Sequence, residues 1–261
     1  MKKTRLDTLP ENLSRDIIDF ISGYPIYDSS SSPEARVYYI EREGGYYLKR
    51  AAYGALKKEA GMAGYFHTLG LSPRVVSYKS AEYDVLLTEA AVGSDLTGEE
   101  YLKRPEWLAR EMGERLRELH SLSGEGCPIG DRTKDYLASV DEGYKTGRID
   151  LSYHLPNMPF ASAEEAYRVI TERRGILSSD TLLHGDFCLP NVIYRGDDLS
   201  SYIDLGAGGI GDRHIDIFWG AWTLNFNLGT EKYRDAFFEA YGRDRIDPDA
   251  LYAVAAAEVF G

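Results

Sequence analysis

The stretch from Leu182 to Asp204 constrains the fold most, because it interrupts a second half that otherwise has helical spacing. It reads LLHGDFCLPNVIYRGDDLSSYID, in which short apolar runs are separated by polar turns. A plain hairpin turn needs only residues such as Gly and Asn. Here the first turn also carries His184, Asp186 and Asn191, and Asp204 follows the next apolar run. Chemically active side chains beside short strands predict a functional site.

The first 90 residues have the pattern of a small antiparallel sheet with one helix. Two aromatic-rich runs flank a turn at Gly44 and Gly45, as in a β-hairpin. A segment of helical spacing and further strand-like runs follow. The expected strands include 37–40, 46–49, 75–78 and 85–90, and the expected helix is 55–69. We therefore expect residues 1–90 to form an N-terminal nucleotide-binding lobe with a five-stranded sheet.

Residues 91–261 are expected to form a second, mainly helical lobe. Between Pro105 and Leu122 apolar side chains recur on one face of an amphipathic helix. A chain of 261 residues is long enough to bury two modest cores. The sequence thus predicts an α+β fold with a β-rich N-terminal lobe and a helical C-terminal lobe, and a small-molecule site at the seam.

Composition and charge exclude two classes of partner. The net charge is −12, whereas a nucleic-acid surface needs clustered Lys and Arg. No stretch approaches the roughly 18 apolar residues of a membrane span, so we expect a cytoplasmic protein without a membrane partner. The acidity suits a cationic ligand, although many cytosolic proteins are acidic for solubility alone. A monomer and a dimer both remain open.

The spacing of the polar residues is that of phosphoryl-transfer enzymes. Asp186 and Asn191 have the separation found in the protein-kinase catalytic loop, and Asp204-Leu205-Gly206 stands where those enzymes have D-F-G. Lys49 ends a strand as the kinase lysine does, and Glu59 follows it by ten residues. Each residue alone has an ordinary structural explanation, such as a turn or a solvated side chain. Their joint order and spacing favour a kinase-like site.

The chemistry of phosphoryl transfer explains these residue types. Mg²⁺ prefers oxygen ligands, which Asn191 and Asp204 supply, and a fixed cation such as Lys49 orients the phosphates. One carboxylate must accept the proton of the attacking hydroxyl, and Asp186 is the candidate.

Residues 184–217 resemble the central region of the aminoglycoside 3′-phosphotransferases, which are bacterial resistance enzymes. The similarity includes Cys-Leu-Pro-Asn and the Gly-x-x-Asp-Arg-x-x-Asp-Ile that follows, and it extends to SSSSPEARVYYI and the terminal AEVF. It implies a protein-kinase-like two-lobed fold. It also implies transfer of the γ-phosphate of ATP or GTP, with Mg²⁺, to a hydroxyl of a cationic aminosugar antibiotic, which confers resistance.

The resemblance assigns roles to matching positions. Asp186 matches the catalytic base, Asn191 and Asp204 match the Mg²⁺ ligands, and His184 and Asp216 match residues that brace the loop. The matching nucleotide-binding residues are Lys49 on the phosphates, Glu59 as its helix partner, Tyr47 on the adenine, Ser30 and Ser31 in the covering loop, and Thr88 and Ala90 in the hinge.

The substrate positions depart from the family pattern. Asp150, Glu258 and Phe260 match substrate-binding residues, but the loop at 150–160 has only one charge. The further departures are Ala257 in place of an Asp, Ala207 and Trp222 in place of Arg, and the extra Gly261. These changes leave two hypotheses. The pocket accepts a different or narrower set of hydroxyl substrates than a typical resistance enzyme, or Asp150, Glu258 and Asp186 with backbone carbonyls are enough to bind a few aminoglycosides. The aromatic run at 218–226 has helical spacing, which favours a place in the core over a ligand pocket.

Two alternatives to an aminoglycoside 3′-phosphotransferase stay open at this point. A kinase of the same fold acting on another small alcohol, such as a sugar, a choline-like amine or a macrolide, is favoured by the depleted acidic loop and disfavoured by the Cys-Leu-Pro-Asn context. A non-catalytic nucleotide-binding module is disfavoured, because it would not need Asp186.

Overall fold

The computed structural model describes residues 3–10, 12–30 and 34–261, which form two compact units. The first unit comprises the chain up to Gly93 together with Arg195–Gly206, and the second comprises Ser94–Tyr194 and Ala207–Gly261. This division differs from the expected boundary after residue 90. The later segment joins the first unit because the Tyr202 amide donates to the Leu71 carbonyl at 2.7 Å and the Tyr202 ring packs edge-on against Phe66.

The first unit is built on an antiparallel sheet of six strands in the order β1-β2-β3-β4-β6-β5. The strands are β1 (Thr4–Arg5), β2 (Ile26–Asp28), β3 (Ala35–Ile40), β4 (Tyr46–Ala52), β5 (Val75–Ser80) and β6 (Tyr83–Glu89). The expected sheet had five strands. The added edge strand β1 pairs with β2 over only two residues, which is too short for any hydropathy pattern to indicate.

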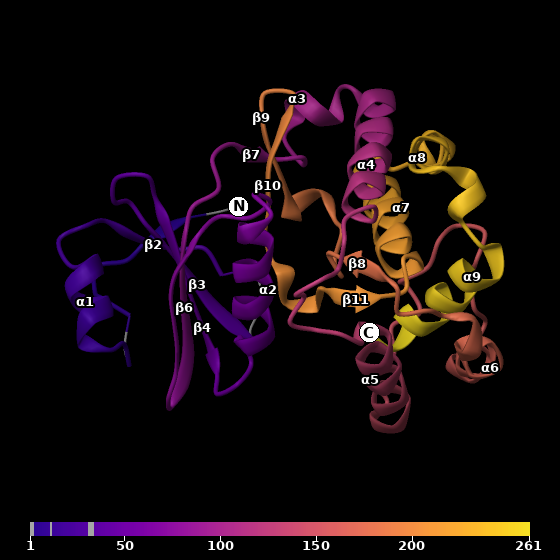
Figure 1. The fold of residues 1–261 in the computed structure, drawn as a ribbon, viewed down its shortest axis with the longest axis horizontal. Coiled ribbons are helices and arrows are strands. Elements are labelled where there is room, and N and C mark those ends of the chain that lie inside the picture. Colours follow the sequence, from indigo (N-terminus) through magenta and orange to yellow (C-terminus); the bar gives the residue numbers. More distant parts are fainter. Residues whose placement is uncertain (1–2, 11, 31–33) are drawn as a thin grey trace. The chain divides into compact units, whose positions relative to one another are not determined.

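Two helices lie on opposite faces of this sheet, α1 (Arg15–Ile21) and α2 (Lys57–Thr68) (Figure 1). Alternation along the strands sends Leu48 into the cluster that includes Ile17 of α1, while Ala51 joins Ala60 of α2. Lys49 is two residues from Ala51 in β4, so both side chains lie on the α2 face of the sheet.

Asp84 fixes the start of α2 on that face. Its buried carboxylate accepts hydrogen bonds from the backbone amides of Gly54 and Leu56, at 3.0 and 2.9 Å. The Tyr78 and Ser80 hydroxyls donate to the same group at 3.0 and 2.6 Å. Four donors compensate for the burial of one charge. The turn that leads into α2 is therefore held in place.

The second unit is mainly helical. Its helices are α3 (Glu99–Leu102), α4 (Pro105–Leu119), α5 (Arg132–Thr146), α6 (Ala163–Arg173), α7 (His214–Leu228), α8 (Arg234–Tyr241) and α9 (Pro248–Ala257). Two small pairings complete the unit: β8 (Thr181–Leu183) with β11 (Gly209–Gly211), and β7 (Ser94–Asp95) with β9 (Val192–Arg195). The remaining strand, β10 (Asp198–Tyr202), belongs to the first unit. Single-turn 3₁₀ helices cover Arg174–Ile176, Leu189–Asn191, Leu205–Ala207, Arg243–Arg245 and Glu258–Phe260.

Helix α4 confirms the amphipathic pattern expected from residue 105, and it ends three residues earlier than expected, at Leu119. The four apolar side chains that share its inner face are all buried: Leu108, Met112, Leu116 and Leu119. Gly113 permits a close crossing with α8, since a Cβ there would lie 2.4 Å from the Phe237 carbonyl oxygen.

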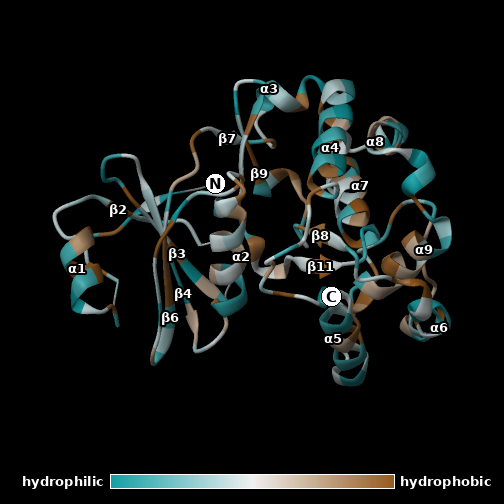
Figure 2. Ribbon diagram, viewed as in Figure 1, coloured by the Kyte–Doolittle hydropathy of each residue, from teal (hydrophilic) through white to brown (hydrophobic). Residues whose placement is uncertain are grey.

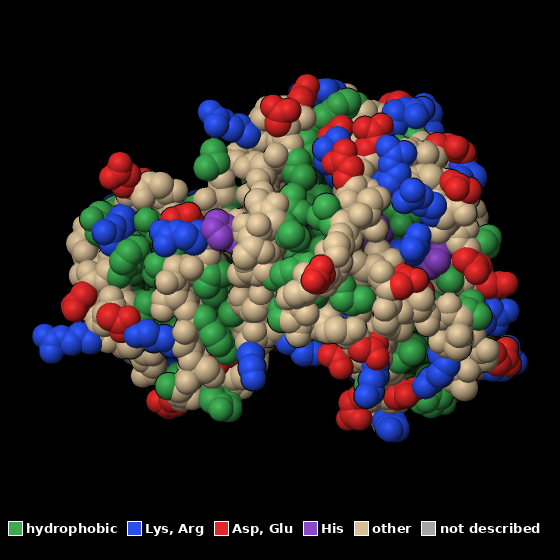
Figure 3. Space-filling model, in the orientation of Figure 1, with side chains coloured by type: hydrophobic (Ala, Val, Ile, Leu, Met, Phe, Trp, Pro, Cys, Tyr) green, Lys and Arg blue, Asp and Glu red, His purple; other side chains and the backbone are tan. Residues whose placement is uncertain are grey.

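The outer surfaces of the second unit are polar. Helix α6 is largely teal in Figure 2, and acidic and basic side chains are interspersed over α4 and α8 in Figure 3. Exposed pairs such as Arg110–Glu106 and Arg243–Glu239 account for part of this pattern. In the described part of the chain, every helix is too short or too polar to cross a membrane.

Candidate active site

Three charged side chains meet in the first unit. Lys49 on β4 places its Nζ 2.8 Å from Oε2 of Glu59 and 3.0 Å from Oδ1 of Asp204. Glu59 lies in the first turn of α2, and Asp204 follows β10. Segments 155 residues apart in sequence are therefore joined by one cation.

The two carboxylates keep Lys49 charged. Burial alone would lower the pKa of this ammonium group, but the charges of Asp204 and Glu59 and their hydrogen bonds raise the pKa above its ordinary value. A permanently charged ammonium fixed between two acids is suited to orienting a polyanionic ligand.

Asp204 has an unusual backbone conformation for a residue with a side chain. Its φ is +58°, in the left-handed region that Gly favours. Asp tolerates this region better than most residues, yet the conformation carries a cost that clusters at functional sites. The Asp204 side chain is 51% exposed, so it is accessible to a ligand.

Tyr47 lies in a row of tyrosines across neighbouring strands. Tyr39 of β3 and Thr88 of β6 stand opposite it, and the Tyr39 and Tyr47 ring centroids are 5.3 Å apart. Tyr27 continues the row, and the Lys3 ammonium group lies 3.3 Å from the Tyr39 ring centroid. The sequence analysis named only Tyr47 of this row. In the predicted hairpin Tyr39 stands opposite Tyr47 with its side chain on the same face, so the pattern could also have indicated Tyr39.

The remaining nucleotide candidates occupy nearby turns of the first unit. The Ala90 amide donates to the Gly45 carbonyl at 3.0 Å, which ties the end of β6 to the β3–β4 turn. The Ser30 hydroxyl accepts the Val37 amide at 2.9 Å. Ser31 lies outside the described residues.

The loop between β8 and the 3₁₀ helix Leu189–Asn191 carries the candidate base. Asn191 Nδ2 donates to Asp186 at Oδ2, at 2.8 Å, and at the backbone carbonyl, at 3.0 Å. The first bond orients the Asp186 carboxylate, and the second ties the Asn191 amide to the loop backbone. They use the amide nitrogen of Asn191 and leave its carbonyl oxygen Oδ1 out of both contacts.

Asp216 braces this loop from α7. Its buried carboxylate accepts the backbone amides of His184 and Gly185 at 2.8 and 2.7 Å. His120 Nε2 lies 3.1 Å from the same carboxylate, and His120 Nδ1 lies 2.9 Å from the Tyr241 hydroxyl. Since a carboxylate only accepts, Nε2 carries the proton and Nδ1 accepts from the tyrosine.

Burial keeps the His120 imidazole neutral. It lowers the pKa of His120, although the Asp216 carboxylate acts in the opposite direction. A neutral His120 leaves one negative charge on Asp216, which is shared between two backbone amides and one imidazole. The loop conformation at Asp186 therefore depends on a buried hydrogen-bond network.

Asp186 and Asn191 open into a pocket of about 360 Å³ within the second unit. The other residues that line it are Tyr153, Cys188, Pro190, Trp219, Trp222, Thr223, Phe226 and Asn227. The sequence interpretation placed the 218–226 aromatics in the core, and this was wrong for three of them. Trp219 and Trp222 are half-buried and Phe226 is 69% exposed, because this face of α7 borders the pocket.

The three expected substrate residues have different surroundings in the second unit, and of these Glu258 lies beside the pocket residue Trp219. Asp150 is exposed and accepts the amide and hydroxyl of Ser152. Phe260 is fully buried and packs edge-on against Tyr144 and Tyr167. Glu258 is also buried. The ten described residues that line the pocket include none of the three.

Glu258 is a buried carboxyl group with an altered proton affinity. Tyr136 donates to its Oε1 at 2.7 Å. Burial raises the pKa of Glu258 to about 7, although hydrogen bonds from Tyr136 and Trp219 and the charge of Arg132 act to lower it. The negative charge of Asp186 raises it further.

This pKa predicts a pH-dependent stability. Because the folded protein holds the Glu258 proton more tightly than the unfolded chain, the contribution is complete below the ordinary pKa of 4.5 and is lost as pH rises through about 7. Glu258→Gln should remove this fall in the free energy of unfolding, measured by urea denaturation across that window. The exposed Glu142→Gln serves as control, and an unchanged slope in the Glu258 variant would contradict the assignment.

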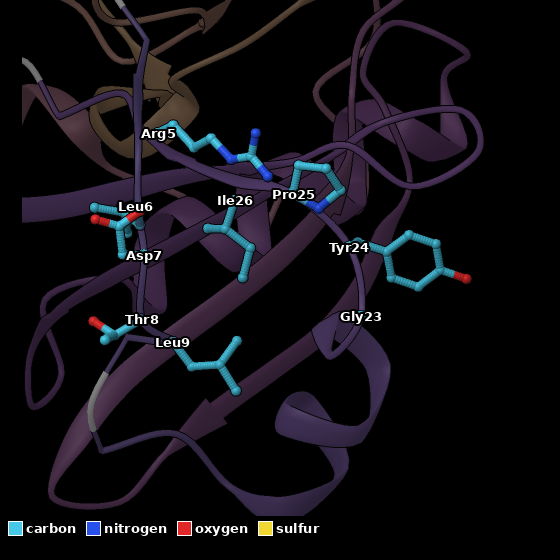
Figure 4. Close-up of a pocket in the computed structure, with 9 residues that line it drawn as sticks. All are labelled: Arg5, Leu6, Asp7, Thr8, Leu9, Gly23, Tyr24, Pro25 and Ile26. Atoms are coloured by element: carbon cyan, nitrogen blue, oxygen red, sulfur yellow. The ribbon is translucent and has the colours of Figure 1, made fainter.

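A second hollow, of about 250 Å³, lies in the first unit (Figure 4). Residues 5–9 and 23–26 line it, and these ranges contain no candidate catalytic or nucleotide-binding residue. We therefore do not take this hollow as the candidate active site.

Comparison with known proteins identifies the family. The sequence profile described as "Phosphotransferase enzyme family" matches residues 30–254. The chain belongs to this phosphotransferase family. Its β-rich first unit and helical second unit agree with that assignment and confirm the predicted α+β, kinase-like fold.

Curated members of the phosphotransferase family align over much of the chain. A protein of Lactococcus lactis named "Probable aminoglycoside 3'-phosphotransferase" is 44% identical over 260 residues, which are 99% of this chain and 97% of that protein. An aminoglycoside 3'-phosphotransferase of Niallia circulans is 31% identical over 182 residues, 68% of each chain.

Solved structures of phosphotransferases share the fold. A type VIII aminoglycoside-3'-phosphotransferase superposes with a TM-score of 0.75 at 24% identity, covering 95% of this chain and 97% of the other. A Streptomyces rimosus aminoglycoside phosphotransferase, in complex with ADP and streptomycin, gives a TM-score of 0.69 at 21% identity over 92% and 94% of the chains.

Proposed function

We propose that this phosphotransferase transfers the γ-phosphate of ATP or GTP, with Mg²⁺, to the 3′-hydroxyl of an aminoglycoside antibiotic. The observation that carries the proposal is the oriented Asp186–Asn191 pair, which opens into a small-molecule pocket and is held from behind by Asp216. The name of the 44% identical relative supports the reaction and the acceptor class.

Asp186 is the general base in this proposal. Its Oδ2 accepts from Asn191, so the carboxylate is positioned before the acceptor arrives. A hydroxyl that enters the pocket would donate its proton to Asp186 as its oxygen attacks phosphorus. Positioning provides much of the catalysis, since an oriented reactant pair avoids the entropic cost of meeting.

Lys49, Glu59 and Asp204 form the nucleotide-binding part. Lys49 would contact the α- and β-phosphates, while Glu59 keeps its ammonium group on the α2 face of the sheet. Tyr47, beside Tyr39, offers a flat aromatic surface for the base. Ser30, Thr88 and Ala90 lie in adjoining strands and turns.

Each unit carries an oxygen donor of the kind that Mg²⁺ prefers. Asn191 Oδ1 and the half-exposed Asp204 carboxylate are hard oxygen ligands. Among the described residues no group of three or more His, Cys, Asp or Glu side chains could hold a metal by itself. When bound, Mg²⁺ would neutralise charge on the transferred phosphate.

An acceptor other than an aminoglycoside is the second candidate. The specific observation in its favour is that Asp150 and Glu258, which were expected to bind ammonium groups, lie outside the residues that line the pocket. A sugar or a less highly charged amine would need fewer carboxylates. A binding-only module has no comparable support, since Asp186 and Asn191 are oriented for chemistry.

Nucleotide turnover coupled to phosphorylated product tests the proposal. The purified chain is assayed with Mg²⁺ and ATP or GTP against kanamycin-like compounds and their 3′-deoxy analogues. We expect product only with compounds that carry the 3′-hydroxyl. Equal turnover with 3′-deoxy analogues would contradict the 3′ position, and no turnover with any aminoglycoside would contradict the substrate class.

A further inference from the structure

We propose that the acceptor is held mainly by stacking against an aromatic wall formed by Tyr153, Trp219, Trp222 and Phe226. The acceptor class that fits is a glycoside whose reacting sugar presents a flat C–H face and few ammonium groups to the pocket. This inference rests on the proposed phosphoryl transfer and concerns how the same site selects its substrate.

The four rings contact one another and line the same pocket as Asp186. Tyr153 lies 5.7 and 5.6 Å from Trp219 and Trp222 between ring centroids, and the two tryptophans are 5.4 Å apart. Trp222 and Phe226 are 4.9 Å apart and nearly parallel, with an interplanar angle of 13°. Such rings offer the broad π-surface on which a sugar face or a cation can rest.

Three of the four rings belong to one face of α7, and Tyr153 comes from the segment between α5 and α6. Trp219, Trp222, Thr223, Phe226 and Asn227 recur at the three- and four-residue spacing of a helix stripe, and all line the pocket. The side chains that occupy the core come from other positions of α7: Ile217, Phe218, Ala221 and Leu224. The exposed ring of Phe226, which stacks on Trp222, thus lines the pocket and is not buried in the core.

The pocket has little charge with which to bind a polycation. Among the ten described lining residues, Asp186 is the only carboxylate. A ligand with several ammonium groups would keep most of them in water. Stacking is therefore the main source of affinity that the lining offers.

The pocket's size also limits what it holds. About 360 Å³ is at the lower end of the roughly 300–1,000 Å³ typical of small-molecule sites. A pocket of this volume can receive one end of an aminoglycoside more readily than the whole molecule. The ring that carries the reacting hydroxyl is the part that must enter.

Hydrogen bonds couple the wall to the catalytic loop. The Leu189 amide donates to Thr223 Oγ1 at 3.2 Å, and Asn227 Nδ2 donates to the Thr223 carbonyl at 2.8 Å. The loop that carries Asp186 is therefore attached to the helix that carries the rings. A sugar stacked on Trp222 would therefore lie beside the loop that carries the base.

Steady-state kinetics of Trp222 variants test the inference. With kanamycin as acceptor, we expect Trp222→Ala to raise KM by roughly tenfold or more with kcat within about threefold, because stacking is lost in the ground state and the transition state alike. Trp222→Phe should recover most of the affinity. Raising the ionic strength to about 1 M, where charges are screened within about 3 Å, should change the wild-type KM by less than about threefold.

Trp107 provides a matched control and a direct binding signal. The chain has three tryptophans, and Trp107 packs on Tyr101 and is not among the pocket residues. Trp107→Phe should retain wild-type KM, and its remaining fluorescence then comes from Trp219 and Trp222 alone. Kanamycin should quench that fluorescence saturably.

The outcomes separate this inference from the function on which it rests. If the wild-type protein phosphorylates kanamycin but Trp222→Ala and Phe226→Ala leave KM unchanged, or if KM rises steeply with salt, the aromatic wall is overturned and the phosphotransferase proposal stands. If the wild-type protein phosphorylates no aminoglycoside and the fluorescence does not respond, both are overturned.

Discussion

Asp186→Asn is expected to lower kcat for acceptor phosphorylation by about 10²- to 10⁴-fold, the range that a positioned general base contributes. The amide is close in size to the carboxylate but cannot accept the hydroxyl proton in the same way. Its carbonyl oxygen can still accept from Asn191 Nδ2, which lies 2.8 Å from Asp186 Oδ2 in the native loop. The KM for nucleotide should change little, because Lys49 and its two acidic partners are untouched.

The matched control is Asp244→Asn, at an exposed Asp of the same unit that is not among the pocket residues. Its kcat and KM should equal those of the wild type. Thermal unfolding of both variants establishes that the fold is intact. A folded Asp186→Asn protein with a kcat within fivefold of the wild type would remove Asp186 from the role of base and direct attention to other groups in the pocket.

Local spacing made part of this site predictable from the sequence. Lys49 and Glu59 are ten residues apart across a strand, a turn and the start of a helix, and such short connections have few possible geometries. Local spacing could not predict the place of Asp204, because it is 155 residues from Lys49 in the sequence. Its position followed from a motif shared with kinases and not from periodicity. The roles of these residues in binding nucleotide and metal remain predictions.

The aromatic face of α7 shows what periodicity cannot distinguish. Trp219, Trp222 and Phe226 have the same helical spacing whether their stripe faces a core or a pocket. On α7 the neighbouring positions already fill the core, with Phe218 and Leu224 both buried. Only the tertiary packing reveals that the second apolar stripe borders an open space.

Long-range pairing limited the sequence analysis of the first unit as well. Residues 195–206 fall within the 91–261 range predicted for the helical lobe. Their contacts with Leu71 and Phe66 place them in the first unit instead. A two-residue edge strand such as β1 likewise has no pattern of its own and exists because β2 offers it a free edge.

Gly185→Ala is expected to lower the free energy of unfolding by at least about 3 kcal/mol, in the range of changes that force backbone to move. Gly185 has a φ of +89°, and a Cβ there would lie 1.9 Å from the Ala207 carbonyl oxygen. That oxygen has little freedom to move, because Arg132 Nε donates to it at 2.7 Å. The Gly185 amide is itself held by Asp216.

Gly229→Ala separates the steric clash from the backbone strain. Gly229 follows α7 with a φ of +64° and has nothing within 4 Å of an added Cβ, so substitution there should cost only about 1 kcal/mol. Urea denaturation of both variants measures the difference. Equal losses would mean that the loop shifts freely to admit a methyl group. In that case the amides of His184 and Gly185 would not be fixed on Asp216, and the positioning of Asp186 by this buried network would lose its structural basis.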